Sequence, residues 1–378
     1  MIEINITKEN NMQKKKIGIS VYPEQAELNE TINYLNVARS YGYEILFVSF
    51  IHMMDKTEKD FEKLLKVIKH ANDLDYYIIA DFHYPSLEKM GIPIDDFKKI
   101  YEMGISCVRF DSPALASELS ALTHNVYGID IQLNMSNNDH LINNVLDYKP
   151  VLTRLNGCHN FYPQKNTGLP FNFFKECNVK YIKNNLETSA FIGSHFGNQG
   201  PAKVNAELPT IELIRDMECD TQAKFLFYTN EINNVLFGNS FASEEELKSV
   251  ASLNRDEITF KINLNSEISA EEKEILYWNK HFRRGDITES FIRSTMSRVE
   301  FKDKKIQPRD NTYIFNRGDV VIVNENGASY KGELHIILND NYQDKNKQYN
   351  LVGKIATQEM LLLNFINPWT HFQFENKK

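Results

Sequence analysis

The chain has 378 residues, of which 42% are hydrophobic and 25% charged. This composition is that of a folded globular protein, and it excludes a disordered or fibrous chain. The net charge is −8 at pH 7, so a nucleic-acid partner would require a local basic patch. The tight basic run Lys14-Lys15-Lys16 directly precedes an apolar segment and is typical of a solvated strand start. We therefore expect no nucleic-acid partner.

The cysteines and the N-terminal segment indicate the compartment. Cys107, Cys158, Cys177 and Cys219 are widely spaced and form no Cys-x-x-Cys pair, which favours a reducing environment. Residues 1–15 are polar and lack the apolar core of a signal peptide, and we expect them to form a disordered extension. No apolar run approaches the roughly 18 residues of a membrane span. We predict a cytoplasmic protein without a membrane partner.

From residue 16 onward, short apolar segments alternate with longer amphipathic segments. This rhythm predicts parallel strands joined by helices. Two helices have recognisable starts, Thr57-Glu58-Lys59-Asp60 and Ser243-Glu244-Glu245-Glu246. Because no Gly-x-Gly-x-x-Gly follows the first strand, eight β/α units favour a (β/α)₈ TIM barrel over residues 16–253. The predicted strands are 17–22, 44–49, 76–81, 106–111, 128–134, 152–156, 189–194 and 234–238.

The pattern changes after residue 253. Residues 257–263, 320–324 and 330–338 alternate as half-buried strands do, and Asn326-Gly327 indicates a tight turn between the last two. Residues 357–366 have a helical pattern. We therefore predict a small, mostly antiparallel β domain over residues 254–378.

The active site of a barrel lies at the carboxyl ends of its strands. Asp81 and Asp111 end neighbouring predicted strands after apolar runs. A single aspartate there is usually a helix cap or a turn residue, but two on adjacent strands favour glycoside chemistry, which needs one acid and one carboxylate. A divalent metal held by Asp81, His83, Asp111 and His159 is the second interpretation, although no His-x-His pair supports it.

Two further groups of strand-end residues suggest ligand contacts. Residues 157–163 combine glycine, imidazole, amide and aromatic groups, which suit stacking on a sugar and hydrogen bonding to it. Residues 194–200 and 238–240 contain glycine, serine and asparagine where barrels often bind phosphate, although ordinary loop glycines would look the same.

These strand ends resemble the 6-phospho-N-acetylmuramidase family over essentially residues 16–374. The most specific segment is Gly157-Cys158-His159-Asn160-Phe161-Tyr162-Pro163. The other matching segments are 19–23, 133–137, 167–169, 208–212, 238–246, 283–286, 292–295, 330–334 and 368–369. The resemblance implies a TIM barrel followed by a cyclophilin-like β-barrel domain. It also implies a cytoplasmic glycosidase that cleaves N-acetylmuramic acid 6-phosphate from N-acetylglucosamine during cell-wall recycling, without a cofactor.

We accordingly expect a small-molecule phosphorylated disaccharide as the substrate. Asp81 and Asp111 are the catalytic candidates, without an assignment of acid and nucleophile or stabiliser, and the 2-acetamido group of the substrate is an alternative nucleophile. The expected sugar contacts are Tyr22, Asn134, Arg154, His159, Asn160 and Tyr162, and the expected phosphate contacts are Asn198 and Asn239. The alternatives are a non-catalytic sugar-phosphate sensor and a metal-dependent barrel hydrolase. A homo-oligomer is compatible with the sequence.

Overall fold

A computed structural model describes residues 14–51, 57–93, 97–111, 114–201, 206–309 and 313–375 of the chain. The chain divides into two compact units, Met1–Leu253 and Asn254–Lys378. Of the predicted disordered extension over residues 1–15, all but Lys14 and Lys15 lie outside the described residues.

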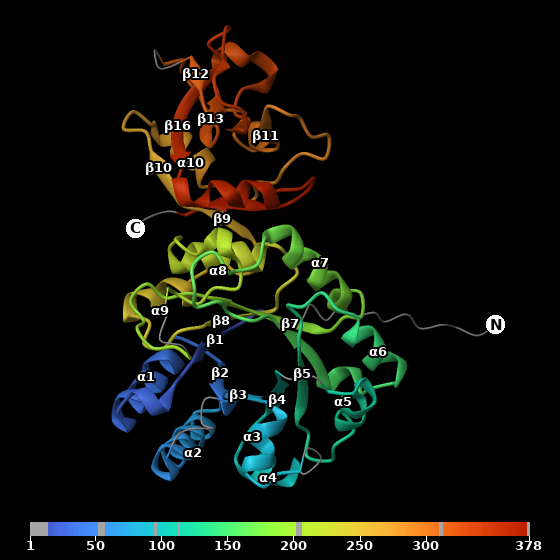
Figure 1. Ribbon diagram of the computed structural model, residues 1–378. Coiled ribbons are helices and arrows are strands. Elements are labelled where there is room, and N and C mark those ends of the chain that lie inside the picture. The colour runs from blue at the N-terminus through green and yellow to red at the C-terminus, as the bar shows by residue number, and fades with distance from the viewer. Residues whose placement is uncertain are drawn as a thin grey trace, which may run out of the picture. The chain divides into compact units, whose positions relative to one another are not determined.

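The first unit is a closed barrel of eight parallel strands in chain order, which confirms the predicted TIM barrel. The ring closes where Lys16 pairs with Asn234. Helices lie outside the ring of strands (Figure 1). The strands are β1 (Lys16–Ser20), β2 (Ile45–Ser49), β3 (Tyr77–Phe82), β4 (Cys107–Phe110), β5 (Asp130–Asn134), β6 (Leu155–Cys158), β7 (Glu187–Ile192) and β8 (Asn234–Phe237). The helices are α1 (Leu28–Ser40), α2 (Glu58–Asp73), α3 (Tyr84–Lys89), α4 (Phe97–Glu102), α5 (Ala116–Leu122), α6 (Leu141–Asp147), α7 (Phe171–Ile182), α8 (Cys219–Tyr228) and α9 (Glu244–Ala251), with short 3₁₀ turns η1 (Pro23–Gln25), η3 (Leu152–Arg154) and η4 (Glu212–Ile214).

Each of the eight predicted strands overlaps an observed one, and their boundaries differ by up to three residues. β6 starts at Leu155, because Leu152–Arg154 forms the turn η3. β7 begins at Glu187, two residues before the predicted start. Its first residues, Glu187 and Thr188, are polar, so apolar alternation did not reveal them.

The two predicted helix starts are confirmed as capping boxes. At α2, the Thr57 hydroxyl accepts a hydrogen bond from the Asp60 amide at 3.2 Å, and the Asp60 carboxylate accepts one from the Thr57 amide at 3.1 Å. At α9, Ser243 and Glu246 exchange the equivalent bonds at 3.2 and 2.8 Å. Such reciprocal bonds satisfy amides that lack partners within the helix.

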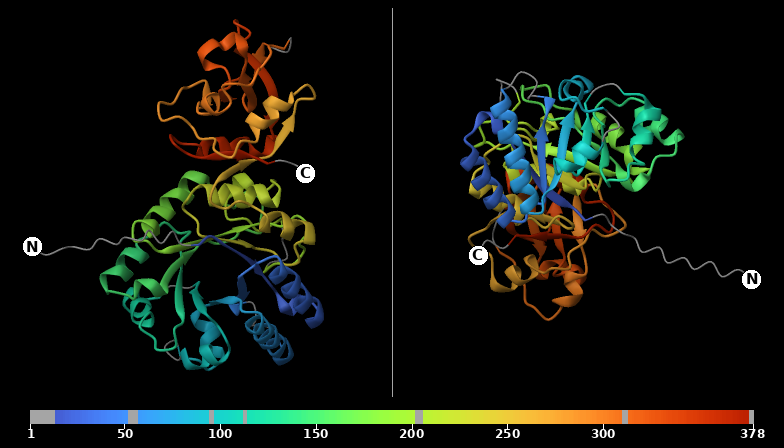
Figure 2. Two further views of the ribbon diagram at one scale, coloured as in Figure 1. Left: turned by 180° about the vertical axis from the view of Figure 1, so that it is seen from behind. Right: turned by 90° about the horizontal axis from the view of Figure 1, so that it is seen from below.

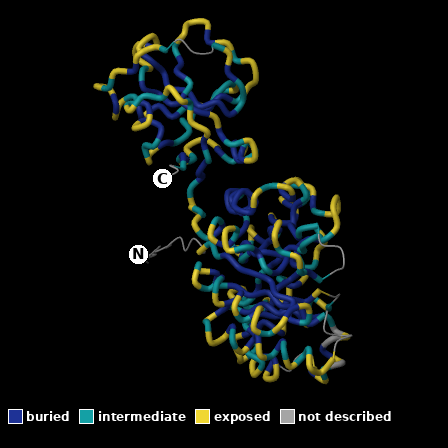
Figure 3. The backbone as a smooth tube through the Cα atoms, turned by 90° about the vertical axis from the view of Figure 1, so that its left-hand side faces the viewer, coloured by how far each residue is buried: buried dark blue, intermediate teal, exposed yellow. Residues whose placement is uncertain are grey.

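Apolar side chains fill the barrel interior below the site. Ile45, Phe47, Ile79, Cys107 and Phe191 belong to one cluster of buried side chains. Figure 3 shows the barrel strands as largely buried, in dark blue, with exposed segments around them. This packed layer supports the polar groups that follow it at the carboxyl ends of the strands.

The second unit is built around a five-stranded antiparallel sheet in the order β10-β16-β13-β14-β11. Figure 2 shows this unit from two further sides, coloured from yellow-orange to red. Two small ladders accompany the sheet, the antiparallel pair β12–β15 and the parallel pair β17–β9. A mainly antiparallel domain was predicted and is confirmed. The strands are β9 (Ile258–Phe260), β10 (Ile262–Leu264), β11 (Phe291–Ser294), β12 (Ile314–Phe315), β13 (Asp319–Val323), β14 (Leu334–Ile337), β15 (Tyr342–Gln343), β16 (Tyr349–Ile355) and β17 (Phe372–Phe374). The helical segments are α10 (Ala270–Leu276), α11 (Ser297–Glu300), η5 (Glu325–Tyr330) and η6 (Thr357–Phe365).

The predicted Asn326-Gly327 hairpin turn is wrong. The Asn324 side chain accepts a hydrogen bond from the Asn326 amide at 2.9 Å and starts the 3₁₀ segment η5, so β14 begins only at Leu334. Side-chain capping by asparagine competes with a two-residue turn, and the sequence pattern does not show which wins.

Within the described residues, no helix is long and apolar enough to cross a membrane.

Candidate active site

The strand register brings Asp81 and Arg109 together. Asp81 on β3 lies opposite Arg109 on β4, and Asp111 follows two residues after Arg109. Because side chains alternate between the faces of a strand, residues 109 and 111 project to the same side. Cys107, one step earlier in this series, belongs to the interior cluster. The alternation of side chains along β4 therefore places the cation of Arg109 and the carboxylate of Asp111 beside Asp81, on the interior face of the barrel at the carboxyl ends of its strands.

Arg109 joins the two candidate carboxylates. Its Nη1 atom lies 2.8 Å from Oδ1 of Asp81 and 3.2 Å from Oδ1 of Asp111, and its Nη2 atom donates a hydrogen bond to Oδ1 of Asn160. The Arg109 side chain is only 4% exposed, whereas that of Asp111 is 37% exposed. One buried guanidinium thus positions a buried and a partly exposed carboxylate next to each other.

The pKa values of both partners of the buried ion pair are raised, but for different reasons. Burial raises the pKa of Asp81 to about 6, with a further contribution from Asp111, while Arg109 opposes the rise. For Arg109, burial lowers the pKa, but the charges of Asp81 and Asp111 outweigh it and the net pKa is raised. Arg109 therefore stays charged, and Asp81 can hold a proton near neutral pH.

The three side chains open into a cavity of about 300 Å³. Its polar lining also includes His159 and Asn160, and aromatic and apolar residues form the rest: Phe47, Ile51, Phe161, Phe191 and Pro201. The ring of Phe161 meets those of Phe47 and Phe191 edge to face, at centroid distances of 6.1 and 5.0 Å. Carboxylates beside aromatic walls are the arrangement found in carbohydrate sites.

Asn134 and Asn160, both predicted sugar contacts, belong to this site. The Asn134 side chain donates a hydrogen bond to Oδ1 of Asp111 at 3.1 Å. Asn160 lines the cavity and accepts from Arg109. Both amides thus hold the charged groups in place, and Asn160 also lines the cavity.

His159, another predicted sugar contact, is fully buried and hydrogen-bonded at both ring nitrogens. Nε2 contacts Oδ1 of Asn178 at 2.7 Å and Nδ1 contacts the Ser136 hydroxyl at 3.1 Å. The Ser136 oxygen in turn accepts from the Asn160 amide at 2.8 Å. Burial lowers the pKa of His159 to about 4, so the ring is neutral. With Nε2 donating and Nδ1 accepting, the imidazole orients Asn160 through Ser136.

The two predicted tyrosines, Tyr22 and Tyr162, follow the ends of β1 and β6. Tyr22 is buried, and its hydroxyl donates to the Gly238 carbonyl oxygen at 2.7 Å, which ties the end of β1 to that of β8. Burial raises the pKa of Tyr22 and also that of the half-buried Tyr162. Tyr162 lies in the segment after Asn160 and Phe161, whose side chains line the cavity.

Arg154 is not brought to the site. It lies in η3, before β6, and its Nη1 atom donates to the carbonyl oxygen of Asn125, which precedes β5. Both positions are at the amino-terminal end of the barrel strands, opposite the cavity. The prediction placed the end of strand six too early, because Leu155 rather than Leu152 begins the strand.

The loops after β7 and β8, where phosphate binding was predicted, contain an internal anion. The Glu246 carboxylate accepts hydrogen bonds from the Ser194 hydroxyl at 2.6 Å and from the His195 amide at 2.8 Å. Asn239 is 1% exposed, accepts from the Ser194 amide and donates to the carbonyl oxygens of Ser194 and Gly197, all at 2.8 Å. Burial raises the pKa of Glu246, but its hydrogen bonds outweigh this effect and the net pKa is lowered.

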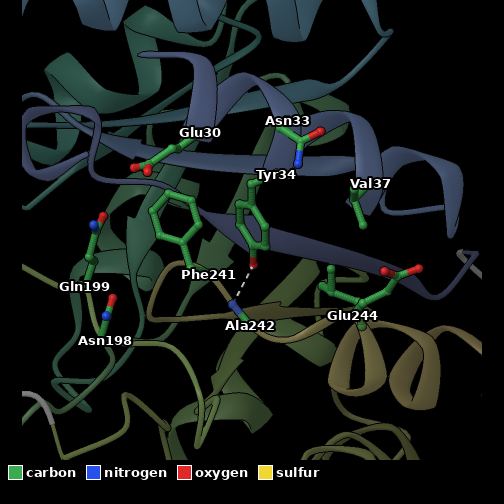
Figure 4. Close-up of a pocket in the computed structure, with 10 residues that line it drawn as sticks. Glu30, Asn33, Tyr34, Val37, Asn198, Gln199, Phe241, Ala242 and Glu244 are labelled. Atoms are coloured by element: carbon green, nitrogen blue, oxygen red, sulfur yellow. Dashed lines mark hydrogen bonds between the residues drawn. The ribbon is translucent and has the colours of Figure 1, made fainter. Parts of the chain in front are cut away.

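Asn198, the other predicted phosphate contact, lines a second cavity of about 490 Å³ (Figure 4). This cavity lies between α1 and the segments that follow β7 and β8. Its lining includes Glu30 and Glu244, and the Tyr34 hydroxyl accepts a hydrogen bond from the Ala242 amide at 3.3 Å. Two carboxylates at its rim make this cavity unfavourable for a phosphate.

The metal alternative receives no support from the geometry. Arg109 lies between Asp81 and Asp111, where a cation would have to bind, and both nitrogens of His159 are used within the protein. Among the described residues, no group of three or more His, Cys, Asp or Glu side chains could hold a metal ion.

Comparisons with known proteins cover nearly the whole chain. Models of the N-terminal and C-terminal parts of 6-phospho-N-acetylmuramidase match residues 17–252 and 258–375. A solved structure of an uncharacterised Bacillus cereus protein is 35% identical, covers 96% of this chain and 100% of that one, and has a TM-score of 0.88. A conserved Enterococcus faecalis protein of unknown function is 24% identical over 96% of both chains, with a TM-score of 0.70. A comparison with curated proteins gave no match.

Proposed function

Because the chain belongs to the 6-phospho-N-acetylmuramidase family of glycoside hydrolases, we propose that it cleaves the glycosidic bond between N-acetylmuramic acid 6-phosphate and N-acetylglucosamine. We place this reaction in the cytoplasm, in the recycling of cell-wall fragments. The substrate is therefore a small phosphorylated disaccharide.

The pair of carboxylates held by Arg109 carries this proposal. Glycoside hydrolysis needs one carboxylic acid and one carboxylate whose environments separate their proton affinities. Asp81 is 7% exposed and has its pKa raised to about 6, chiefly by burial. Asp111 is more exposed and is supported by Arg109 and Asn134. We therefore assign Asp81 as the acid and Asp111 as the partner carboxylate.

The proton path follows from the hydrogen bonds. Since Oδ1 of Asp81 accepts from Arg109, the proton of the acid form belongs on Oδ2. That proton passes to the glycosidic oxygen as the bond to the anomeric carbon breaks. Asp111 stabilises the positive charge that develops on the sugar, either directly as a nucleophile or through the 2-acetamido group. Water then attacks the anomeric carbon and returns a proton to Asp81.

The spacing of the carboxylates favours retention of configuration. The two Oδ1 atoms contact one nitrogen at 2.8 and 3.2 Å, so they lie closer together than the roughly 6.5–9.5 Å found in inverting enzymes. A catalytic water would have no room between them. Both routes open to Asp111, the covalent one and the acetamido-assisted one, retain the configuration.

Fewer of the predicted residues qualify as sugar contacts once the cavity is considered. Asn160 and Phe161 line the cavity, and Asn134 contacts Asp111 at its rim. We propose Phe161 as a stacking surface and the two amides as hydrogen-bonding groups. His159 acts through Ser136 and Asn160, and Tyr22 joins two strand ends, so both are positioning residues.

Kinetics with matched disaccharides test this function. We expect the 6-phosphorylated muramyl disaccharide to be cleaved with kcat/KM about 10³-fold above that of the unphosphorylated form, since phosphate contacts of several kcal/mol help to hold the sugar at the acid. Equal values for the two substrates would instead identify a general aminosugar glycosidase. No cleavage of either one would contradict the proposal and favour a sugar-phosphate sensor.

A further inference from the structure

Among the described residues of the barrel cavity, the anionic groups of the proposed substrate have no evident cationic partner. Among the described residues that line the cavity, Arg109 is the cation, and its guanidinium is already bonded to Asp81, Asp111 and Asn160. The loops after β7 and β8 hold the carboxylate of Glu246. A muramyl 6-phosphate carries both a phosphate and a lactyl carboxylate. Cations elsewhere in the described chain are therefore candidate partners for these two groups.

The C-terminal unit contains arginines fixed by a buried carboxylate. Glu333 is fully buried, and its oxygens contact Nη2 of Arg293 at 3.0 Å and Nη1 of Arg298 at 2.7 Å. The two arginine side chains remain 19% and 32% exposed. Both guanidiniums also lie over the Tyr330 ring, at 5.9 and 5.7 Å from its centroid. The carboxylate and the ring together restrict both cations to defined positions.

A third arginine and an exposed tryptophan continue this surface. The Arg284 amide donates to the Arg293 carbonyl oxygen at 2.9 Å, and its side chain pairs with Asp286. Trp369 packs against Gly285, where a Cβ atom would lie 2.2 Å from the indole, so a larger residue there would displace the ring. The Trp369 side chain is 66% exposed. Its backbone has a positive φ of 68°, a conformation that costs energy in a non-glycine residue.

We propose that Arg284, Arg293, Arg298, Tyr330 and Trp369, here called the arginine–tryptophan patch, form a binding site for an anionic amino sugar. Arginine forks recognise phosphate and carboxylate groups, and an exposed indole held in one position is a platform for a sugar ring. The ligand class rests on the proposed function. The site would make the C-terminal unit a substrate-binding module in its own right.

The charge of the patch supports this assignment. Three arginines face two carboxylates, Asp286 and Glu333, in a chain whose net charge is −8. Burial lowers the pKa of the neighbouring His335, although Glu333 opposes the effect, so this ring adds little charge near neutral pH. The patch is thus a local cationic region on an acidic protein, which attracts small anions and is screened by salt.

The two tryptophans of the chain provide a specific readout. They are Trp278 and Trp369, so the full-length variant Trp278→Phe reports fluorescence from the patch alone. We expect N-acetylmuramic acid 6-phosphate to change this emission in a saturable manner, with weaker binding at 0.5 M salt. N-acetylmuramic acid and N-acetylglucosamine 6-phosphate, titrated separately, show whether the carboxylate or the phosphate supplies the affinity. Unmodified N-acetylglucosamine should bind at least tenfold more weakly than the best of these anions.

Two substitutions in the Trp278→Phe background test the patch itself. Arg284→Gln removes a cation whose carboxylate partner, Asp286, is exposed, and we expect the Kd to rise about tenfold. Arg298→Lys keeps the charge next to Glu333 but loses the planar fork, and should also weaken binding. Lys345→Gln removes an exposed positive charge elsewhere in the unit and serves as the control with unchanged Kd.

The outcomes separate this inference from the proposed function. If none of the anionic sugars changes the Trp369 emission, or if Arg284→Gln and Lys345→Gln bind equally well, the patch is not a sugar site, whatever the enzyme cleaves. If the disaccharide is not cleaved but the patch still binds the sugar phosphate, the proposed function fails and the binding site remains.

Discussion

Arg109 joins two neighbouring carboxylates that differ in burial, and we propose different chemical roles for them. It contacts both, yet Asp81 is buried and has its pKa raised to about 6, whereas Asp111 faces the cavity with more than a third of its side chain exposed. An acid and a carboxylate can therefore coexist side by side, as a retaining glycosidase requires. The assignment of these roles leads to two predictions at single residues.

Replacing either carboxylate should abolish most of the turnover. We expect Asp81→Asn and Asp111→Asn each to lower kcat by about 10²-fold or more, because each change removes an ionisable group that acts on the transition state. Asp130→Asn is the matched control, since burial also raises the pKa of Asp130 but this residue lies at the start of β5. Near-normal kcat combined with a lower melting temperature would show that Asp81 or Asp111 is only structural.

The pH dependence should report the proton on Asp81. The acid form is active, so kcat/KM should be level below pH about 6 and fall about tenfold per pH unit above it. The charge of Asp111 contributes to raising the pKa of Asp81. In Asp111→Asn, the residual kcat/KM should therefore begin its alkaline decline at a lower pH than in the wild type. A decline that stays in place or moves to higher pH in this variant would contradict the assignment.

Sequence reasoning identified the carboxylates but not the cation between them. Asp81 and Asp111 are visible because each follows an apolar strand, whereas Arg109 lies inside a predicted strand and its importance depends on the pairing of residue 109 with residue 81. The alternation of side chains along β4, which places residues 109 and 111 on the same face, could have indicated Arg109. Arg154 was misplaced because a three-residue boundary error moves a side chain to the opposite end of the barrel.

At the level of elements, α9 uses its own carboxylate to organise the loop after β7. Glu246 completes the capping box with Ser243 and also binds Ser194 and His195 from the neighbouring loop. The capping box was readable from the sequence, but the second set of bonds depends on the closeness of two loops. The same donors would otherwise be available to a phosphate.

Glu246→Gln should therefore lower stability without changing phosphate selectivity. The amide retains one acceptor oxygen, so backbone donors in the loop lose a partner, at a cost of about 1–3 kcal/mol in the free energy of unfolding. Denaturant unfolding measures this loss, and Glu245→Gln, at an exposed neighbouring position, is the control. The kcat/KM ratio of phosphorylated to unphosphorylated disaccharide should stay unchanged. A ratio that drops toward one would restore these loops as the phosphate site.

Across the whole molecule, the barrel was predictable because repeated β/α units impose a regular pattern over more than half of the chain. The C-terminal unit was less predictable. β11, β12, β15, β16 and β17 were not predicted, and the 257–263 segment divides into β9 and β10 at Lys261. Strands of an antiparallel sheet are short and paired between distant residues, such as Val321 with Leu351, so local patterns constrain them weakly.

The chemistry of the whole enzyme should be independent of metal. The carboxylates are bridged by Arg109, and glycoside hydrolysis proceeds on carboxylates alone. We expect turnover of the phosphorylated disaccharide to be unchanged after dialysis against EDTA. Activity that disappears with the chelator and returns with zinc or magnesium would overturn this expectation and revive the metal interpretation of Asp81, His83, Asp111 and His159.

Product analysis after incubation with the phosphorylated muramyl disaccharide tests the central claim most directly. Mass spectrometry of the wild-type reaction should show free N-acetylglucosamine and N-acetylmuramic acid 6-phosphate in equal amounts, and the same reaction with Asp81→Asn should show about 10²-fold less of both. An intact disaccharide in the wild-type reaction, or equal product from Asp81→Asn, would contradict the account of an Asp81-driven 6-phospho-N-acetylmuramidase.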